Sequence, residues 1–245
     1  MPRFFVPSDN FTENSVRITG DDAFHIARAL RMAVGDSLTV CDMHGCEYSC
    51  LITKIRDDAC ECDIISKSEG KTESPVYISL YMAYPKGDKL EVVTQKAVEL
   101  GASEIIPFES SRCVKKPKPE KAAREHERLT KIAEEAAKQC GRSRLVKIHS
   151  ALSFKDMLEK AKEADAALFC YEGDGARSLK EVLSSLNNNI KSLAVIVGSE
   201  GGFSLSEAEA AKESGAITVN LGPRILRCET APSYALASIS YHFEL

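Results

Sequence analysis

The stretch VIVGSEGGFSLSEAE (195–209), followed by NLGPRILRCETA (220–231), decides the fold of this chain. In each segment an apolar strand ends in a loop rich in glycine and charged residues, and a helix follows the first loop. Open α/β sheets bind ligands in a crevice outside the carboxyl ends of their strands. If the two strands are neighbours, their loops form one small-molecule pocket.

The region after residue 75 alternates between predicted strands and helices. Apolar runs predict strands at residues 75–84, 104–108, 145–149, 166–171, 193–198 and 216–222. Helical spacing and glycine stop signals predict helices at residues 89–101, 119–140, 153–163, 178–186, 205–214 and 230–243. Ser204 and Glu207 form a capping box for the fifth of these helices. Such alternation predicts an α/β fold with a mostly parallel sheet covered on both faces.

The region before residue 70 has a different pattern. Short runs of alternating residues predict strands at 15–20, 36–43, 46–56 and 59–67, which suggests a small β-barrel. Residues 21–32 (DDAFHIARALRM) predict a helix, with Asp21 or Asp22 as its N-cap. The polar stretch SEGKTESP (68–75) reads as a linker. We therefore expect two domains, at residues 1–70 and 75–245.

Composition and length indicate an ordinary globular protein. The 245 residues are 44% hydrophobic and 28% charged, which allows one large domain or two modest ones. No apolar run approaches the length of a membrane span, and the N-terminal MPRFFVPSDN lacks the apolar core of a secretory signal. We expect a cytoplasmic protein without a membrane partner.

The nine cysteines follow no disulfide framework, so reduced thiols are the expected state. One cluster, CDMHGCEYSC (41–50), brings three cysteines and His44 close together. Its spacing matches no paired zinc-ligand pattern, and the segment also reads as a β-hairpin. We expect cysteines of a hairpin there and no metal site.

Positive charge collects in one part of an acidic chain. The net charge is −4, yet basic residues outnumber acidic ones between Arg112 and Lys131. Nucleic-acid binding depends on where positive charge gathers, so the net charge does not exclude it. A solvated loop and helix face explains the same pattern.

The motifs that are absent narrow the choice of ligand. The chain has no GxxxxGK[ST] and no GxGxxG after the first strand of its α/β region, which argues against a nucleotide-binding oxidoreductase. The loop GSEGG instead carries Glu200, whose charge is unfavourable beside a pyrophosphate and favourable beside a sulfonium cation. The loop therefore suits S-adenosylmethionine, although glycines that only permit a tight turn would give the same spacing.

These same motifs resemble those of a known family. GSEGGFSLSE (198–207) and LGPRILRCETA (221–231) closely resemble the motif pair of the ribosomal RNA small subunit methyltransferase E family. KGDKLEVVTQKAVELGASEIIPF (86–108) and EEAAKQCGR (134–142) also resemble family signatures. The resemblance implies S-adenosylmethionine-dependent methylation of uridine N3 in 16S rRNA, on the assembled small subunit. It further implies a SPOUT-type trefoil-knotted domain behind a PUA-like barrel, and a homodimer. A knot is contrary to the general rule that chains avoid threading.

The resemblance also implies the residues of the cofactor site. The motif match assigns cofactor binding to Tyr171, Glu172, Gly173, Gly198, Glu200, Gly201, Gly202, Leu221, Gly222, Ile225, Leu226, Glu229 and Thr230. Glycines allow backbone amides to approach the ligand, and the apolar members can wall the adenine. Packing in the core is an equal reading for Leu226. Ser199 stands where the family usually has proline, so the first loop loses a fixed φ.

The reaction requires uridine N3 to lose its proton before or during attack on the methyl group. A cation that stabilises the uridine anion would assist this step. We predict Arg227, with Arg224, as the catalytic residues because their loop must face both the methyl group and the base. A structural salt bridge with Glu229 or Glu200 is the other explanation for them.

The resemblance favours RNA contact for the basic residues. The predicted RNA-binding residues are Arg3, Arg28, Arg31, Arg112, Lys115, Lys116, Lys118, Arg124, Gln139, Arg142 and Arg144. A non-catalytic RNA-binding or ribosome assembly factor with a retained cofactor pocket is the alternative function. The intact charged residues of both loops argue against that alternative.

Overall fold

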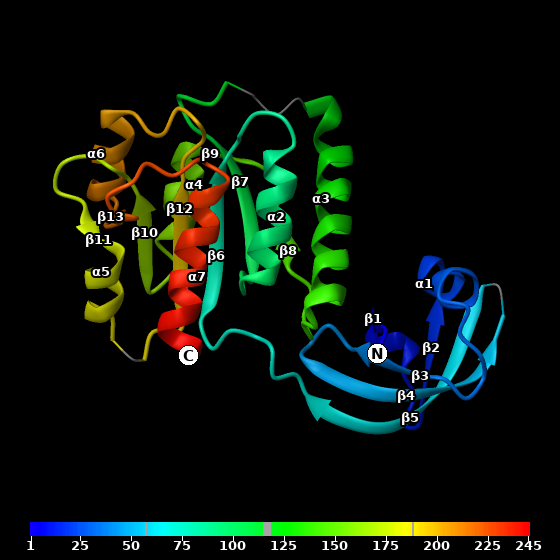
Figure 1. Ribbon diagram of the computed structural model, residues 1–245. Coiled ribbons are helices and arrows are strands. Elements are labelled where there is room, and N and C mark those ends of the chain that lie inside the picture. The colour runs from blue at the N-terminus through cyan, green and yellow to red at the C-terminus, as the bar shows by residue number, and fades with distance from the viewer. Residues whose placement is uncertain (57, 115–118, 188) are drawn as a thin grey trace. The chain divides into compact units, whose positions relative to one another are not determined.

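The strands of the chain form two separate sheets, one in each of two units (Figure 1). The computed structural model describes residues 1–56, 58–114, 119–187 and 189–245. One unit comprises Met1–Glu73 with Ala137–Leu145, and the other comprises Ser74–Ala136 with Val146–Leu245. The segment Ala137–Leu145 thus belongs with the N-terminal strands, although it follows the predicted linker in sequence.

The second unit is built on a parallel sheet. Its strands are β6 (Tyr77–Ala83), β7 (Glu104–Glu109), β8 (Lys147–Ile148), β9 (Leu152–Ser153), β10 (Ala166–Cys170), β11 (Arg177–Ser178), β12 (Ser192–Val197) and β13 (Ile217–Asn220). The order is β11-β13-β10-β12-β6-β7-β8, with β9 also paired to β7. The pairings described in this sheet are parallel. The central strands are almost wholly buried, as their unbroken apolar runs predict.

Six helices of this region lie where the sequence predicts them. They are α2 (Lys89–Glu99), α3 (Pro119–Cys140), α4 (Phe154–Ala161), α5 (Leu179–Ser185), α6 (Leu205–Glu213) and α7 (Thr230–Glu244). Helices α2 and α7 lie side by side along one face of the sheet (Figure 1). The predicted capping box of Ser204 and Glu207 is present at the start of α6. None of the helices in the described part of the chain combines the length and apolar character that a bilayer crossing requires.

The first unit contains a curled five-stranded sheet. Its strands are β1 (Arg3–Phe5), β2 (Ser15–Thr19), β3 (Ser37–Cys41), β4 (Cys46–Ile55) and β5 (Ala59–Glu69), in the order β1-β3-β4-β5-β2. Alternating residues bury one side of these strands around Phe4, Ile18, Leu38 and Ile52. Among the described residues, the pairings of this sheet are antiparallel except that of β1 with β3.

The helix predicted at residues 21–32 is only partly correct. Only α1 (Asp21–Phe24) is α-helical, and the chain continues as a π-helix over His25–Ala29. Gly20 is the N-cap residue, and no side chain caps the helix. The Asp22 carboxylate instead accepts a hydrogen bond from the Lys138 ammonium at 2.8 Å, so a tertiary contact replaces the predicted local one.

Candidate functional site

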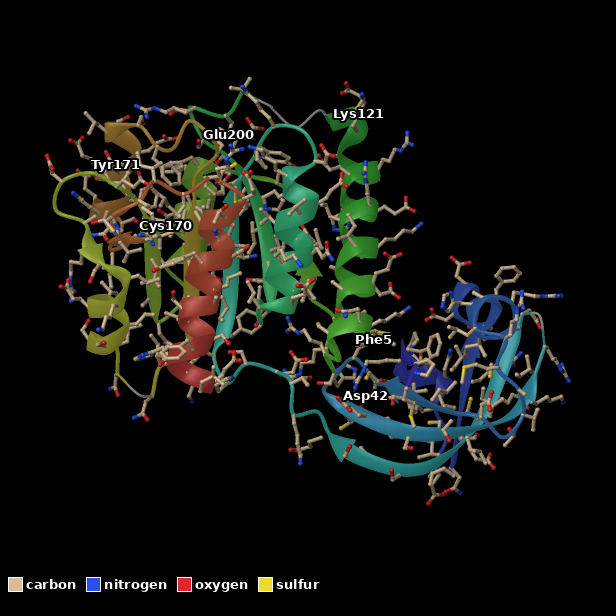
Figure 2. All side chains as sticks on the ribbon, in the orientation of Figure 1. Phe5, Asp42, Lys121, Cys170, Tyr171 and Glu200 are labelled. Atoms are coloured by element: carbon tan, nitrogen blue, oxygen red, sulfur yellow. The ribbon has the colours of Figure 1, made fainter. Side chains whose placement is uncertain are left out.

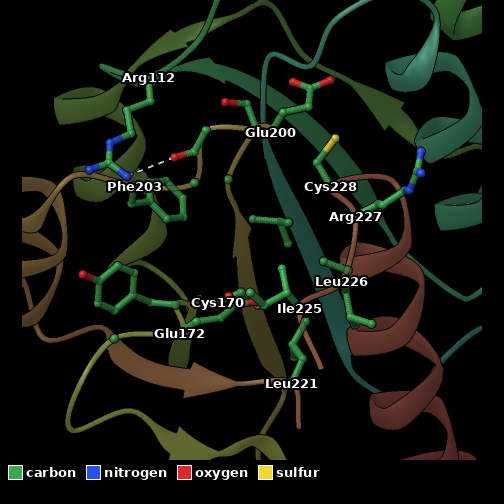
Figure 3. A pocket seen from close by; sticks show the side chains of 18 of the residues that line it. Arg112, Cys170, Glu172, Glu200, Phe203, Leu221, Ile225, Leu226, Arg227 and Cys228 are labelled. Carbon is green, nitrogen blue, oxygen red and sulfur yellow. Dashed lines mark hydrogen bonds between the residues drawn. The ribbon is translucent and has the colours of Figure 1, made fainter. Parts of the chain in front are cut away.

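A cavity of about 710 Å³ opens at the carboxyl ends of three strands of the parallel sheet (Figure 3). Its walls come from the loops that follow β10, β12 and β13, with further residues from α2 and from the segment after β7. The strands β12 and β13 are not direct neighbours, because β10 lies between them. The loop after β10 therefore joins the two predicted loops in one cavity, and Tyr171 marks it in Figure 2.

The structure gathers most of the predicted cofactor residues around this cavity. The predicted residues that line it are Tyr171, Glu172, Gly173, Gly198, Glu200, Gly201, Gly202, Leu221, Ile225, Leu226 and Arg227. The predicted residues Gly222, Arg224, Glu229 and Thr230 lie in the same loop or just after it but are not among the lining residues. The lining residues that the sequence did not assign to the cofactor are Lys89, Arg112, Cys170, Val197, Ser199, Phe203, Leu205, Val219, Cys228 and Ala231.

The glycines of the first loop are required by close packing. Gly202 has a φ of 61°, in the region that favours glycine. A Cβ at Gly198 would lie 3.2 Å from the Gly202 Cα, and one at Gly201 would lie 2.9 Å from the Arg112 Cβ. A side chain at Gly201 would therefore clash with Arg112, and one at Gly198 would be crowded against Gly202. The glycines thus permit the tight turn, and they also expose backbone atoms along the cavity wall.

Apolar side chains form another wall of the cavity. Ile225 is 86% exposed, and Leu221 and Leu226 are half-buried. The Phe203 side chain is buried, with its ring centroid 4.2 Å from that of Phe169. Exposed aliphatic surface beside a cavity gains free energy when a ligand covers it. For Leu226, half-burial means that it contributes to both the wall and the packing beneath it.

Lys89 joins the two loops through an ion-pair network. Its Nζ lies 3.0 Å from Glu200 Oε1 and 3.2 Å from Glu229 Oε2. The backbone N–H of Lys86 donates a second hydrogen bond to Glu200 Oε1, at 3.0 Å. Hydrogen bonds to Glu200 and then Glu229 raise the pKa of Lys89, so this residue stays protonated.

The two carboxylates stay ionised in this network. Burial opposes ionisation of Glu200, but the hydrogen bonds that it accepts, including those from Lys89 and Lys86, hold its pKa below the usual value. Glu229 accepts a hydrogen bond from its own backbone N–H and from Lys89, which lowers its pKa. Burial, with the Glu229 hydrogen bond, raises the pKa of the neighbouring Cys228 to about 12. The thiol is therefore neutral and donates to Glu229.

The predicted catalytic arginines do not form ion pairs with these two carboxylates. Within the described residues, neither Arg224 nor Arg227 has a carboxylate partner within 4.0 Å. Both side chains are exposed. Arg227 lines the cavity opposite Arg112, as Figure 3 shows. The salt bridge considered as the other explanation for these arginines is thus made by Lys89 instead.

Arg112 contacts the first loop directly. Its Nη1 donates a hydrogen bond to the carbonyl oxygen of Gly201 at 3.1 Å (Figure 3). The adjacent Ser111 donates to the Glu207 carboxylate through its backbone N–H at 2.7 Å and its hydroxyl at 2.8 Å. The segment after β7 is therefore fastened to the cofactor loop and to α6. Its position follows from the rule that carboxyl ends of parallel strands share one edge.

Two of the predicted RNA-binding arginines are engaged inside the first unit. The guanidinium of Arg142 is 5% exposed and pairs with Glu73, with 2.6 Å between Nη2 and Oε2. Arg3 pairs with Glu47 at 2.8 Å and donates to the Arg142 carbonyl oxygen at 3.2 Å. These ion pairs differ from the predicted role in RNA binding, because an RNA phosphate would have to replace the partly buried carboxylate of Glu47 or Glu73.

The other predicted RNA-binding residues that the structure describes are exposed. They are Arg28, Arg31, Arg112, Arg124, Gln139 and Arg144. The guanidinium of Arg144 lies over Gly45, where an added Cβ would be 2.9 Å from its Nε. Lys115, Lys116 and Lys118 lie outside the described residues.

The cysteine cluster forms the predicted hairpin. Cys41 ends β3 and Cys46 begins β4, and the Asp42 carboxylate accepts hydrogen bonds from the backbone N–H groups of His44 and Cys46. All nine cysteines are free, six of them buried. No group of three or more potential metal ligands occurs in the part of the chain that the structure describes.

Comparisons with known proteins agree with this geometry. A family described as RNA methyltransferase domain matches residues 72–240, and one described as RNA methyltransferase PUA domain matches residues 18–65. The chain is 37% identical over 231 residues to ribosomal RNA small subunit methyltransferase E of Bacillus subtilis, covering 93% of this chain and 90% of the relative. The corresponding protein of Synechocystis is 29% identical over 97% of this chain and 77% of its own length.

Solved structures give the same result. The crystal structure of a ribosomal RNA small subunit methyltransferase E from Neisseria gonorrhoeae, bound to S-adenosyl methionine, superposes with a TM-score of 0.85. It is 28% identical and covers 98% of this chain and 97% of the other. The similarity therefore extends over both units.

Proposed function

Because the chain belongs to the ribosomal RNA small subunit methyltransferase E family, we propose that it methylates N3 of a uridine in 16S rRNA. The activity class is that of an S-adenosylmethionine-dependent RNA methyltransferase. The observation that carries the proposal is the cavity at the ends of β10, β12 and β13, where both motif loops meet. Its volume falls in the range of small-molecule sites, roughly 300–1,000 Å³.

The residues of the cavity fit S-adenosylmethionine. Gly198 and Gly201 have little room for a side chain and bring backbone to the cavity, while Ile225 and Leu226 offer apolar surface for an adenine. Lys89, Glu200 and Glu229 together carry one net negative charge, which favours a cationic ligand. When bound, the cofactor supplies a methyl group on a sulfonium.

We assign the chemistry of the uridine to Arg227, with Arg224 as its neighbour. A guanidinium without a carboxylate partner can stabilise negative charge that develops on the base as N3 loses its proton. Lys89 stays protonated between its two carboxylates, so it does not take this proton. Glu200 and Glu229 are held as anions and keep the cavity favourable to a cation.

We propose that RNA is held by exposed basic residues and by Gln139. Arg28, Arg31, Arg124, Gln139 and Arg144 are exposed and can contact phosphates without breaking the ion pairs described for Arg3 and Arg142. Lys115, Lys116 and Lys118 remain part of the proposal on charge alone. The target base must leave its stack to reach the cavity.

The remaining proposals rest on family membership. They are a PUA-like RNA-binding domain at residues 1–70, a SPOUT methyltransferase domain with a C-terminal knot at residues 75–245, a homodimer, a cytoplasmic location and the assembled small subunit as substrate. The match of a PUA domain to residues 18–65 supports the first.

The test is methyl transfer from radiolabelled S-adenosylmethionine to small subunits and to free 16S rRNA, both from cells that lack the modification. We expect labelled N3-methyluridine, found by mass spectrometry of digested RNA, mainly with the subunits. Cofactor binding without transfer to either substrate would favour the non-catalytic assembly factor. Absence of cofactor binding would refute the proposed function itself.

A further inference from the structure

Lys89 occupies a position that helix stability does not explain. It is the first residue of α2, where the partial positive charge of the helix N-terminus disfavours a cation. Asp88, at the N-cap position, makes no side-chain cap hydrogen bond that would stabilise this end. The contacts that offset the unfavourable placement are therefore those that Lys89 makes outside its own helix.

Those contacts reach both loops of the cavity. Glu200 belongs to the loop after β12, and Glu229 ends the loop after β13. The Lys89 Nζ contacts one carboxylate oxygen of each, at 3.0 and 3.2 Å, and lies 3.7 Å from the Cys228 Sγ. One ammonium thus holds two loops that are separated by β10 in the sheet.

We propose that Lys89 is a positioning residue that fastens both cofactor loops to the start of α2. The inference rests on the proposed function and adds a residue to it. Without this cation, Glu200 and Glu229 would keep their hydrogen bonds from Lys86 and Cys228 but would lose the positive charge that lies between them. Like charges at this distance repel, so the loops would move apart and the cavity between them would lose its shape.

The test compares three ligands that share an adenosine and a thioether or sulfonium sulfur. They are S-adenosylmethionine, S-adenosylhomocysteine and 5′-methylthioadenosine, the last of which lacks the amino-acid carboxylate. A loop clamp acts on the whole cavity, so Lys89→Met should weaken S-adenosylhomocysteine and 5′-methylthioadenosine by about tenfold in calorimetry, and S-adenosylmethionine by less because the variant cavity carries one more net negative charge. A direct contact from Lys89 to the ligand carboxylate would instead leave 5′-methylthioadenosine unaffected, and that result would overturn the proposal.

Two variants make the result specific. Lys89→Arg keeps a cation that can pair with both carboxylates, so it should restore binding to within about threefold of the parent. Lys96→Met removes another lysine of α2, one whose ion pair with Glu99 lies on the surface, and should not change binding. Equal binding by Lys89→Met and the parent would refute the clamp.

A structural readout covers the case in which Lys89→Met folds poorly. In the double variant Glu200→Gln and Glu229→Gln, Lys89→Met should cost much less affinity, because the two negative charges that repel each other are absent.

Hydrogen exchange of the apo Lys89→Met protein should be faster in the loops 198–203 and 221–229 only. Faster exchange throughout the parallel sheet would assign Lys89 to general stability and contradict the proposal. If the parent protein binds none of the three ligands, the proposed function fails rather than this inference.

Discussion

Arg227 lines the cavity, has no carboxylate partner within 4.0 Å among the described residues, and is not the cation that pairs with Glu200 and Glu229. If it stabilises charge on the uridine, its loss should affect the transition state more than the cofactor. We expect Arg227→Ala to lower kcat by about a hundredfold or more, a size common for the loss of one charge-stabilising group. The dissociation constant for S-adenosylmethionine should change less than about threefold.

Single-turnover methylation together with calorimetry separates these two effects. Arg224→Ala is the comparison, because Arg224 is in the same loop but does not line the cavity, so its loss should cost less activity than that of Arg227. An unchanged methylation rate in Arg227→Ala would remove Arg227 from the catalytic assignment. Equal losses in the two variants would indicate RNA contact by the loop instead.

Ser199 allows a prediction about stability. Its Oγ is the one buried side-chain polar atom, among the residues that the structure describes, that has no hydrogen-bond partner. Removing such a hydroxyl removes a desolvation cost, so Ser199→Ala should raise the free energy of unfolding by about 1 kcal/mol.

Ser204→Ala, which deletes the N-cap of α6, should lower the free energy of unfolding by about 1 kcal/mol. Urea unfolding measures both, and a destabilised Ser199→Ala protein would show that the hydroxyl has a partner in solution.

The site residues that can be predicted from the sequence are those that directly follow a strand, because the end of the strand determines their position. Residues 171–173, 198–202 and 221–227 follow three strands whose carboxyl ends share an edge, so pattern and resemblance place most of them correctly at the cavity. Lys89 was missed because nothing local to the start of α2 indicates which loops approach it. Arg112 was assigned to RNA from its charge, although its position after β7 also brings it to the same edge.

At the scale of helices and strands, long elements are easier to predict from the sequence than short ones. The six helices of the second unit have long apolar faces and clear end signals, and all six are present. The strands β1, β9 and β11 were not predicted, because two or three residues carry too little alternation to identify a strand, whereas the equally short β8 lies within the predicted apolar run 145–149. Residues 21–32 were predicted as one helix, but a π-helix follows after Phe24, and Asp22 pairs with Lys138 rather than capping the helix.

The Glu73–Arg142 pair should make the first unit sensitive to acid. Burial opposes ionisation of Glu73, yet Arg142 and the N–H groups of Ser143 and Arg144 hold its pKa below the usual value. A lowered folded-state pKa stabilises the protein above the unfolded value of about 4.3, and this contribution is lost as pH falls through the folded pKa. The first unit should therefore lose stability below about pH 4.

Thermal unfolding between pH 3 and 7, followed by a probe of the first unit, measures this effect. Glu73→Gln should be less stable than the parent at pH 7, by about 1–3 kcal/mol, because the variant loses the charged hydrogen bonds that Glu73 accepts from Arg142 and from the N–H groups of Ser143 and Arg144. It should also lose the part of the pH dependence that Glu73 supplies. Parallel pH profiles for variant and parent would contradict the assignment.

For the whole molecule, the first unit should not be stable as residues 1–73 alone. That fragment lacks Ala137–Leu145, which supplies the Arg142 side chain for Glu73 and the carbonyl oxygen for Arg3. We expect it to be unfolded or only marginally stable in circular dichroism. Fusing residues 137–145 to it through a short flexible linker should restore a cooperative urea transition, and the same fusion with Arg142→Met should not. A fragment 1–73 as stable as the fusion would refute this.

The salt dependence of RNA binding is also a property of the whole molecule. The chain has a net charge of −4, so binding depends on a few exposed cations rather than on overall attraction. Arg124→Gln should weaken RNA binding and lower the slope of log K against log salt by about 1. Glu127→Gln is the matched control on the same helix and should not reduce the slope. Identical slopes for Arg124→Gln and the parent would exclude a phosphate contact.

The assignment of Ala137–Leu145 to the first unit has a consequence for biosynthesis. A ribosome makes the chain from its N-terminus, so β1 to β5 leave the exit tunnel well before Arg142 does. Most domains can fold as soon as they emerge, but this one must wait until about two fifths of the second unit has been translated. Nascent chains stalled before residue 145 should therefore be protease-sensitive and bound by chaperones, and a rare-codon pause beyond that point should help folding more than one placed at the linker.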